Sequence, residues 1–581
     1  MLELPLLHGS ELERRVPSDS GGPSNLPWWS WSSERALQLK RGGVLTYPGD
    51  VLKQPVAAFG PLVEGARLTG EVAGAGLATV VVSRADGRRE RLEFFLGEGD
   101  ADARFRAFEL PFSRLSAQLG ELPVPRFELE LGAAGTGGAV WRSPELLVPF
   151  PARAESEFRA ELVAELRWII DLWLERAADR AGPRRTAFLT HIFDVVSGEP
   201  LAPLAGDHNV FFDLLFRAAA ETGEPRWQAA FDRFLGDYLE LCLHPETGLP
   251  RRWDTRLDRP LDDDSIEIST KLGFLIDMAE RGPEERRQEC LEAARRIAST
   301  VLRVGLAPDG GVAAKYRPSD GRPDPHVAHL RRLDLPAQLV RLSAFEGPEA
   351  ARALIDAARE AAAAVEYTLR WPGSWEEIDP GFDDIYGHFG QRATEMLRIA
   401  PEEDLFRRLS AGGLVHYLPM WHQAVRHGGN VAADQVRCWE IACDLAGLEP
   451  DLLPEVAPVL ADAARLHLVG QQYDSGAWGD VTVYGFDPRD NLQVGDLPGT
   501  PQNLLFGLAL LHDERLEAAG GLHRDQLRAL FAGVLESTRV AYRRPFGYLS
   551  TRREAAGANP SRGSIAVATG VVELLERLPR D

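Results

Sequence analysis

Cysteine is scarce in this 581-residue chain, and its spacing excludes two common kinds of small fold. The four cysteines are Cys242, Cys290, Cys438 and Cys443. No two of them form a CxxC pair, so neither a zinc ribbon nor a disulfide framework is predicted. Since no HxH or HExxH spacing occurs either, we predict no metal site and no cofactor.

Long apolar runs and a basic leader segment are also absent. No apolar stretch reaches the ~18 residues that are needed to span a bilayer. The N-terminal stretch MLELPLLHGSELERR lacks the basic region and long apolar run of a signal peptide. We therefore expect a cytoplasmic protein without a membrane partner. Secretion is the alternative if a signal peptide preceded the given sequence.

Positive charge is in short supply. The chain has 65 lysines and arginines against 87 acidic residues, a formal net charge of −22. Broad binding of nucleic acid needs a basic surface that displaces counterions, so this balance argues against a nucleic-acid partner. An apolar content of 44% is typical of a folded protein. The length predicts roughly 2 to 4 domains.

The first part of the chain predicts β-structure. Segments 66–87, 104–112 and 126–150 alternate between apolar and polar residues or run apolar, with Gly and Asp-Gly turns between them. Several such runs without helical periods are typical of an antiparallel β-sandwich. We assign the sandwich to residues 41–152, after an irregular N-terminal arm at 1–40.

From about Glu155 the hydrophobic period becomes helical. Apolar positions recur at Phe158, Leu162, Leu166, Ile169 and Trp173. This is the spacing of one buried helix face, and roughly a dozen further helical segments follow. The remainder of the chain, 153–581, is therefore predicted to be helical.

Two kinds of connection alternate along the helical part. Short ones combine Gly, Pro and acids, as in ETGEP at 221, whereas long ones are rich in glycine and aromatics, as in WPGSWEEIDPGFDDIYGHFG at 371. This alternation indicates a degenerate repeat of helical hairpins, with all long loops at one end. A closed ring of six or seven hairpins, an (α/α) toroid, explains so many converging loops better than an open stack.

In five long loops a glycine precedes an aromatic residue. The aromatic residues are Trp253, Tyr316, Trp375, Trp478 and Tyr548. Packing within its loop explains each one singly. Together they would line a funnel, and loops on a rigid scaffold are where binding residues concentrate.

This organisation resembles the six-hairpin (α/α)-toroid carbohydrate-active enzymes. That broad group contains glycoside hydrolases and polysaccharide lyases, often with an attached β-sandwich. The resemblance covers nearly the whole chain but is architectural, so no family's catalytic residues are carried over. It implies a carbohydrate-active enzyme with an oligosaccharide or polysaccharide substrate. A second resemblance, of Gln472–Trp478 to the QW repeat of terpenoid cyclases, rests on one copy only.

The segment GFDDIYGHFG at 381–390 is the strongest candidate for a catalytic centre. Asp383 is expected to cap the following helix, where an acid suits the positive end of the helix dipole. Capping does not explain the other titratable residues of the segment. Nor does it explain the three glycines, each of which weakens a helix interior by about 1 kcal/mol. The candidate catalytic residues are Asp383, Asp384, Tyr386, His388 and, from the preceding loop, Glu377.

Other long loops contribute candidates for substrate binding. Tryptophan rings can stack on sugars, and the polar residues can bind hydroxyl or carboxylate groups. The predicted substrate-binding residues are Trp253, Trp375, Trp478, Tyr484, His208, Asn430 and Arg392. A plain structural hydrogen bond is the alternative role for His208.

Two reactions fit these residues. Hydrolysis of a glycosidic bond needs two carboxyl groups, of which one donates a proton and the other activates water or attacks the sugar. β-Elimination on a uronate needs a base and a group that neutralises the substrate carboxylate, roles that suit Tyr386, His388 and Arg392. The many acids favour hydrolysis. A non-catalytic glycan-binding protein would need the tryptophans but not the converging acids.

Overall fold

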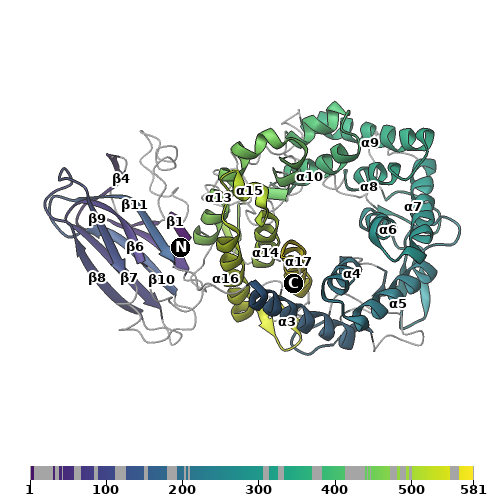
Figure 1. The fold of residues 1–581 in the computed structure, drawn as a ribbon, viewed down its shortest axis with the longest axis horizontal. Coiled ribbons are helices and arrows are strands. Elements are labelled where there is room, and N and C mark those ends of the chain that lie inside the picture. Colours follow the sequence, from purple (N-terminus) through teal and green to yellow (C-terminus); the bar gives the residue numbers. More distant parts are fainter. Residues whose placement is uncertain are drawn as a thin grey trace.

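A computed structural model of the chain shows a β-region beside a ring of helices (Figure 1). The structure describes residues 2–5, 30–32, 38–41, 43–57, 67–83, 89–111, 126–148, 155–178, 193–199, 201, 204–206, 210–304, 313, 315–324, 333–369, 383–411, 439–440, 442–444, 446–470, 480–483, 492–495, 500–549 and 562–579. None of the helices in these ranges is long and apolar enough to cross a bilayer.

The β-region consists of two antiparallel sheets that share a core. Its strands are β1 (Leu2–Pro5), β2 (Ser30–Ser32), β3 (Gln38–Lys40), β4 (Gly43–Thr46), β5 (Val51–Ala57), β6 (Arg67–Gly74), β7 (Gly76–Ser83), β8 (Arg89–Leu96), β9 (Arg106–Pro111), β10 (Arg126–Ala133) and β11 (Ala139–Val148). One sheet has the order β3-β4-β11-β6-β9 with β1 on β11, and the other has the order β2-β5-β10-β7-β8. The indole Nε1 of Trp141 donates to the carbonyl of Gly132 at 3.2 Å and so links the two sheets.

The predicted β-segments are confirmed, but the prediction of an irregular arm is wrong in part. Strands β6, β7, β9, β10 and β11 fall in the three segments singled out from the sequence. Strands β1, β2 and β3 lie within 1–40, where no strand was expected. They are too short to show an alternating pattern, and they are held by pairing with β11, β5 and β4.

The helices alternate between an outer and an inner layer of the ring (Figure 1). The outer helices are α3 (Glu155–Trp173), α5 (Pro225–Leu241), α7 (Glu284–Val304), α9 (Pro348–Leu369), α13 (Leu453–Gly470) and α16 (Arg524–Tyr542). The inner helices are α4 (Val210–Thr222), α6 (Ser269–Arg281), α8 (Asp334–Ser343), α10 (Asp383–Ile399), α14 (Thr500–Leu511) and α17 (Arg562–Arg577). A short helix, α15 (Glu514–Ala518), follows α14, and the segment 439–448 is helical where it is described.

The ring is closed by its last helix. Helix α17 packs against α14, against α3 and against the first inner helix, α4. At this closure Arg159 of α3 donates to the carbonyl of Leu575 at 2.9 Å. A closed ring, rather than an open stack, is therefore the arrangement of the described helices.

The two ends of the ring differ as the sequence predicts. Inner helices α4, α6 and α8 are joined to the following outer helices by only a few residues. The connections that lead into inner helices are long, as between α5 and α6 or α7 and α8. The N-termini of the inner helices therefore share one end of the ring, called here the long-loop end, and their C-termini share the short-turn end.

Small antiparallel ladders stiffen the long loops. They are built from β12 (Leu204–Ala205), β13 (Arg252–Asp254), β14 (Arg259–Leu261), β15 (Ile266–Glu267), β16 (Lys315–Tyr316), β17 (Asp480–Val483), β18 (Leu492–Gly495), β19 (Arg543–Arg544) and β20 (Gly547–Tyr548). Trp253, Tyr316 and Tyr548 in these ladders are at most 6% exposed. For these three aromatics the funnel-lining prediction is wrong, because each ring is covered by its own loop and the helices beneath.

Candidate active site

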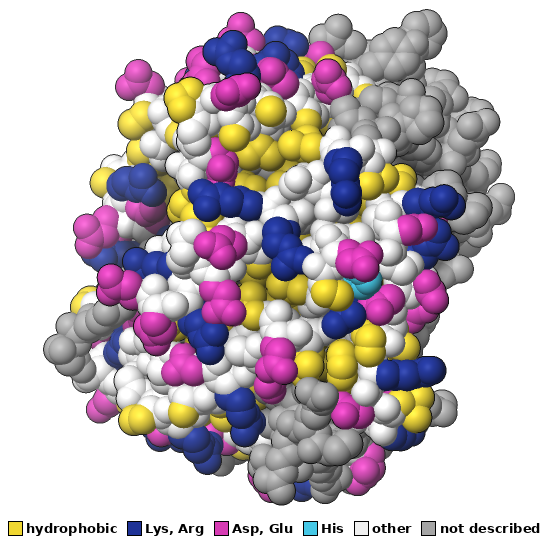
Figure 2. Space-filling model, turned by 90° about the vertical axis from the view of Figure 1, so that its right-hand side faces the viewer, with side chains coloured by type: hydrophobic (Ala, Val, Ile, Leu, Met, Phe, Trp, Pro, Cys, Tyr) yellow, Lys and Arg dark blue, Asp and Glu magenta, His cyan; other side chains and the backbone are white. Residues whose placement is uncertain are grey.

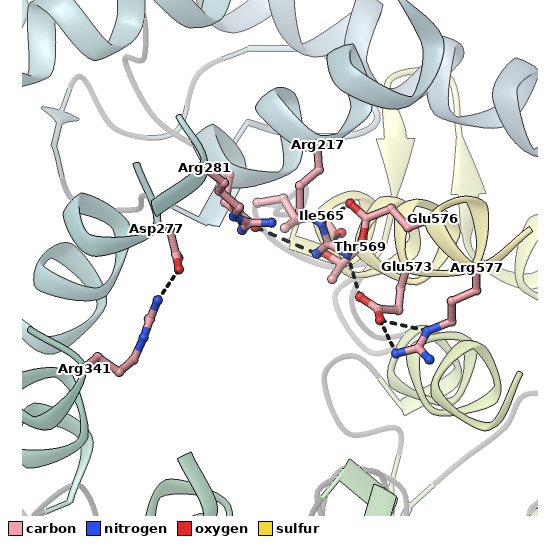
Figure 3. Close-up of polar contacts among 10 residues, drawn as sticks. Arg217, Asp277, Arg281, Arg341, Ile565, Thr569, Glu573, Glu576 and Arg577 are labelled. Carbon is pink, nitrogen blue, oxygen red and sulfur yellow. Dashed lines mark hydrogen bonds and ion pairs between the residues drawn. The ribbon is translucent and has the colours of Figure 1, made fainter. Parts of the chain in front are cut away.

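Charged side chains of neighbouring inner helices meet inside the ring. Figure 3 shows Arg217 reaching from α4 towards Glu573 and Glu576 of α17. Its Nη2 lies 2.6 Å from a carboxylate oxygen of each. On the same face of α4, one turn earlier, Asp213 forms an ion pair with Arg281 of α6. Helix α4 is thus tied to both of its inner neighbours.

The same kind of contact continues through α6, α8 and α10. Arg341 of α8 lies 2.6 Å from Asp277 and 3.0 Å from Glu280, both on α6 (Figure 3). The Nε of Arg392 on α10 donates to Asp334 of α8 at 2.7 Å. Each inner helix in this half of the ring is therefore linked to the next by an arginine–carboxylate pair.

The segment 439–448 extends this series of pairs. Asp444 forms an ion pair with Arg398 of α10, and the positive charge of Arg577 on α17 also favours its ionised form. We call this series of contacts the ion-pair belt. Its members are Asp213, Arg217, Asp277, Glu280, Arg281, Asp334, Arg341, Arg392, Glu395, Arg398, Asp444, Glu573, Glu576 and Arg577.

The belt was missed in the sequence, although a signal for it exists. On α4 an acid stands four residues before an arginine, at Asp213 and Arg217, and α17 repeats this spacing at Glu573 and Arg577. Residues four apart lie on one helix face. Acid–arginine pairs at this spacing on otherwise apolar helices indicate a charged face that is turned away from the hydrophobic core.

Glu440 is a strongly perturbed carboxyl group beside these contacts. Burial raises its pKa to about 8, and the nearby carboxylates of Asp444 and Glu395 add to this, while Arg392 opposes them. The side-chain amide of Gln391 on α10 donates to Glu440. A carboxyl group with such a pKa is mostly protonated at neutral pH, so it can donate a proton to a substrate.

The carboxyl groups beside Glu440 differ from it in ionisation or in hydrogen bonding. Burial raises the pKa of Asp444 to about 6, against the effect of Arg398, so Asp444 is mostly ionised at neutral pH. Glu395 accepts a hydrogen bond from Arg392 at one carboxylate oxygen. Its other oxygen, Oε2, is buried and has no hydrogen-bond partner among the described residues. A protonated and an ionised carboxyl group therefore line the same cavity.

The predicted catalytic segment lies at the start of an inner helix. Helix α10 begins at Asp383, where the sequence analysis placed a helix start. Asp384, Tyr386 and His388 occupy its first two turns, and the structure describes the backbone there but not the side chains. The segment is thus at the long-loop end of the ring, and the orientation of its side chains stays a prediction.

The helical period separates these positions into two faces. Positions 384 and 388 precede Arg392 by eight and four residues, so they share its face of α10. Position 386 precedes Ala393 and Leu397 by seven and eleven residues and shares theirs, and both of those residues are buried. Asp384 and His388 therefore extend the face that carries Arg392 and Glu395, whereas Tyr386 does not.

The structure describes the surroundings of two predicted substrate-binding residues. Trp253 is 6% exposed, so its ring presents no open face on which a sugar could stack. Arg392 already binds two carboxylates, those of Asp334 and Glu395. Its charge is thus balanced within the protein. The other predicted site residues lie outside the described residues; they are Glu377, Trp375, Trp478, Tyr484, His208 and Asn430.

No group of three or more His, Cys, Asp or Glu side chains that could hold a metal ion occurs in the described part of the chain. The neighbouring carboxylates of the ion-pair belt are neutralised by arginine side chains instead. The site, as far as it is described, is a set of carboxyl groups tuned by burial and by guanidinium groups.

The comparisons with known proteins concern the fold. No protein-family model matches the chain, and no curated protein matches it. Similar solved structures include D-mannose isomerase (12% identity, 74% of this chain and 100% of that chain, TM-score 0.43). Others are an alpha-1,2-mannosidase from Trichoderma reesei (12%, 73% and 94%, 0.46) and a family 76 glycoside hydrolase from a bovine Bacteroides thetaiotaomicron strain (8%, 90% and 95%, 0.38).

At these identities the similarity assigns no role to any residue. The outer face of the ring adds a further observation. Figure 2 shows acidic and basic side chains interspersed over it, with apolar ones between them. The described part of that face carries no continuous basic surface.

Proposed function

We propose that this chain is a carbohydrate-active enzyme that hydrolyses glycosidic bonds inside the ring, with Glu440 as the proton donor. The observation that carries the proposal is a carboxyl group on the helical segment 439–448 whose pKa is raised by burial to about 8 and which lines a cavity of the ring. A general acid works best when its pKa lies near the working pH. The substrate class is an oligosaccharide or polysaccharide that enters from the long-loop end.

The second carboxyl group of the reaction is assigned to Asp384, with Asp383 as the alternative. Glu440 is hydrogen-bonded to Gln391, seven residues after Asp384 on the same helix. At 1.5 Å per residue, positions 384 and 391 are about 10 Å apart along the axis of α10. The side chain of Asp384 can therefore bring its carboxyl group to within roughly 5 to 10 Å of the Glu440 carboxyl group, which is the separation that glycosidases use.

Two observations favour hydrolysis over β-elimination: the ion pairs of Arg392 and the helix face on which position 386 lies. A lyase needs a free cation for the uronate carboxylate, and the guanidinium of Arg392 is already held by Asp334 and Glu395. Position 386 shares a helix face with the buried Ala393 and Leu397, which does not suit a catalytic base. Both observations count against the residues that the lyase alternative requires.

The proposal is tested by a screen against neutral and uronate glycans. Reducing ends and the ultraviolet absorbance of unsaturated products are measured together. New reducing ends without that absorbance are expected for wild type, and Glu440→Gln should lower the rate by about 10²- to 10⁴-fold. Both signals together would show a lyase. Undiminished hydrolysis by Glu440→Gln would remove Glu440 from the mechanism.

A further inference from the structure

A cavity opens at the short-turn end of the ring, away from the long loops. Its volume is about 400 Å³, and arginines from three elements line it: Arg398 of α10, Arg515 of α15 and Arg577 of α17. Arg398 and Arg577 stand in the last turns of their inner helices, and Arg515 follows the short turn after α14. The cavity is therefore separate from the entrance that a glycan would use. Its volume is that of a small-molecule site.

Each of these arginines uses only part of its guanidinium group within the protein. Arg577 donates Nε and Nη2 to Glu573, and Arg515 donates Nε and Nη2 to Asp513. Arg398 donates Nη2 to Asp444. A guanidinium has five N–H donors. The Nη1 atom of each arginine therefore has hydrogens that no described residue accepts.

Each guanidinium group of the lining has one carboxylate partner. Arg398 pairs with Asp444, Arg515 with Asp513 and Arg577 with Glu573. These pairs leave the Nη1 atoms as the unused donors of the lining. The same carboxyl groups are acceptors for hydroxyl donors, so the lining offers an anion-binding side and a hydroxyl-binding side.

We propose that this cavity is a second binding site, and that its ligand is a small hydroxylated anion, a monosaccharide that carries one phosphate or carboxylate group. The anionic group binds the Nη1 sides of Arg515 and Arg577, and the hydroxyl groups donate to Asp513 and Asp444. A neutral sugar has no anionic acceptor for these Nη1 donors. Inorganic phosphate lacks the carbon-bound hydroxyl groups that the carboxylates would hold.

The chain offers a variant that fills the cavity without touching its charges. Gly447 lies in the lining, and a Cβ built on it would meet only Arg515 Nη1, at 3.6 Å. Gly447→Phe therefore places a ring in the cavity beside Arg515 and removes none of its arginines. Arg515→Gln removes one guanidinium group from the lining. Because the side chain of Arg515 is 59% exposed, the fold is kept. Arg352→Gln on the exposed surface of α9 is the matched control.

Binding is measured by isothermal titration calorimetry on the full chain, at neutral pH, with glucose 6-phosphate, gluconate, glucose and inorganic phosphate. Wild type should bind glucose 6-phosphate or gluconate, and the tighter of the two identifies the anionic group. Gly447→Phe and Arg515→Gln should each weaken that binding by about tenfold or more, and Arg352→Gln by less than about twofold.

Three results would overturn the proposal. One is no heat from either sugar anion with wild type. Another is equal binding of glucose or of inorganic phosphate, which would remove the requirement for charge or for hydroxyl groups. The third is unchanged binding by a Gly447→Phe variant that melts like wild type. The cavity shares Glu440 with the proposed active site, but Gly447 and Arg515 have no part in the proposed hydrolysis. Weaker binding in variants of these two residues therefore reports on the cavity and not on the hydrolytic function.

Discussion

At the scale of single residues, Glu440 combines a cost in stability with a chemical use. Burial and the neighbouring carboxylates raise its pKa to about 8 in the folded protein, above the value of an exposed glutamate. The folded state then binds the proton more tightly than the unfolded state. Its contribution to stability is present at low pH and is lost as the pH rises through about 8.

We therefore predict that Glu440→Gln melts at a higher temperature than wild type at about pH 8.5, and that the difference shrinks towards about pH 5. The amide cannot ionise, and it can still accept the hydrogen bond of Gln391. Differential scanning calorimetry at both pH values measures the effect. Glu289→Gln, on the exposed face of α7, is the control and should melt like wild type. Equal melting of Glu440→Gln and wild type at both pH values would contradict the raised pKa.

The start of α10 allows a test with an internal control. Asp384→Asn and His388→Ala should each lower the rate of glycan hydrolysis by about 10²- to 10⁴-fold, because both positions share the face of Arg392. Tyr386→Phe should leave the rate within a few fold, because position 386 shares the face of the buried Ala393. Steady-state kinetics on variants that melt like wild type decide the matter. A large loss for Tyr386→Phe alone would favour the lyase alternative.

Single aromatic residues were harder to assign from the sequence than acids on a helix. The glycine–aromatic pattern marked the right loops, but Trp253, Tyr316 and Tyr548 are buried in them. Sequence spacing shows that an aromatic belongs to a loop and not which side of the loop is covered. On α10, by contrast, the helical period sorts positions 384 and 388 from position 386 once one face is known to be buried.

At the scale of elements, the pairs of the ion-pair belt stabilise the contacts between helices. Arg217 and Glu573 have side chains that are only 12% and 13% exposed. Burial opposes ionisation of Glu573, yet Arg217 and Arg577 hold its pKa below the usual value. The stability that it contributes is therefore present at neutral pH and is lost in acid as the carboxylate is protonated.

We predict that Arg217→Met destabilises the protein by about 3 kcal/mol at neutral pH, because Glu573 loses one of its two arginine partners at a largely covered site and Glu576 loses the arginine that it binds. Arg286→Met, which breaks a half-exposed pair with Glu289 on α7, should cost less than about 1 kcal/mol. Thermal unfolding compares the two matched variants. A similar small loss in both would mean that solvent already screens the pairs inside the ring.

Regular elements were predicted from the sequence where their residues interact locally. The buried positions of α3 are those that recur at helical spacing, from Phe158 to Trp173. Strands β1, β2 and β3 were not predicted, because their conformation depends on pairing with distant strands. The belt depends likewise on contacts such as that of Arg217 with Glu573. Only the spacing within each helix is local.

At the scale of the whole molecule, closure of the ring makes distant parts of the sequence neighbours. Helix α17 packs between α14 and α4, and α4 lies near the start of the helical part. In an open stack a disturbance of α17 would reach α14 and α16 only. In a closed ring it must also loosen α4, since Arg217 binds Glu573 and Glu576 across the closure.

Gly570→Leu tests this closure directly. A Cβ built on Gly570 would lie 2.8 Å from the Cβ of Leu505 and 2.9 Å from the backbone nitrogen of Phe506, so α17 has to move away from α14. We predict faster amide hydrogen exchange in Val210–Thr222 as well as in Thr500–Leu511. The control is Gly236→Leu on α5, where the added Cβ meets only Arg286 Nη2, at 3.5 Å. It should leave exchange in α14 and α17 unchanged. If Gly570→Leu speeds exchange in α14 but not in α4, the ring does not close through α17, because a closed circle of packed helices cannot open at one contact without straining the next.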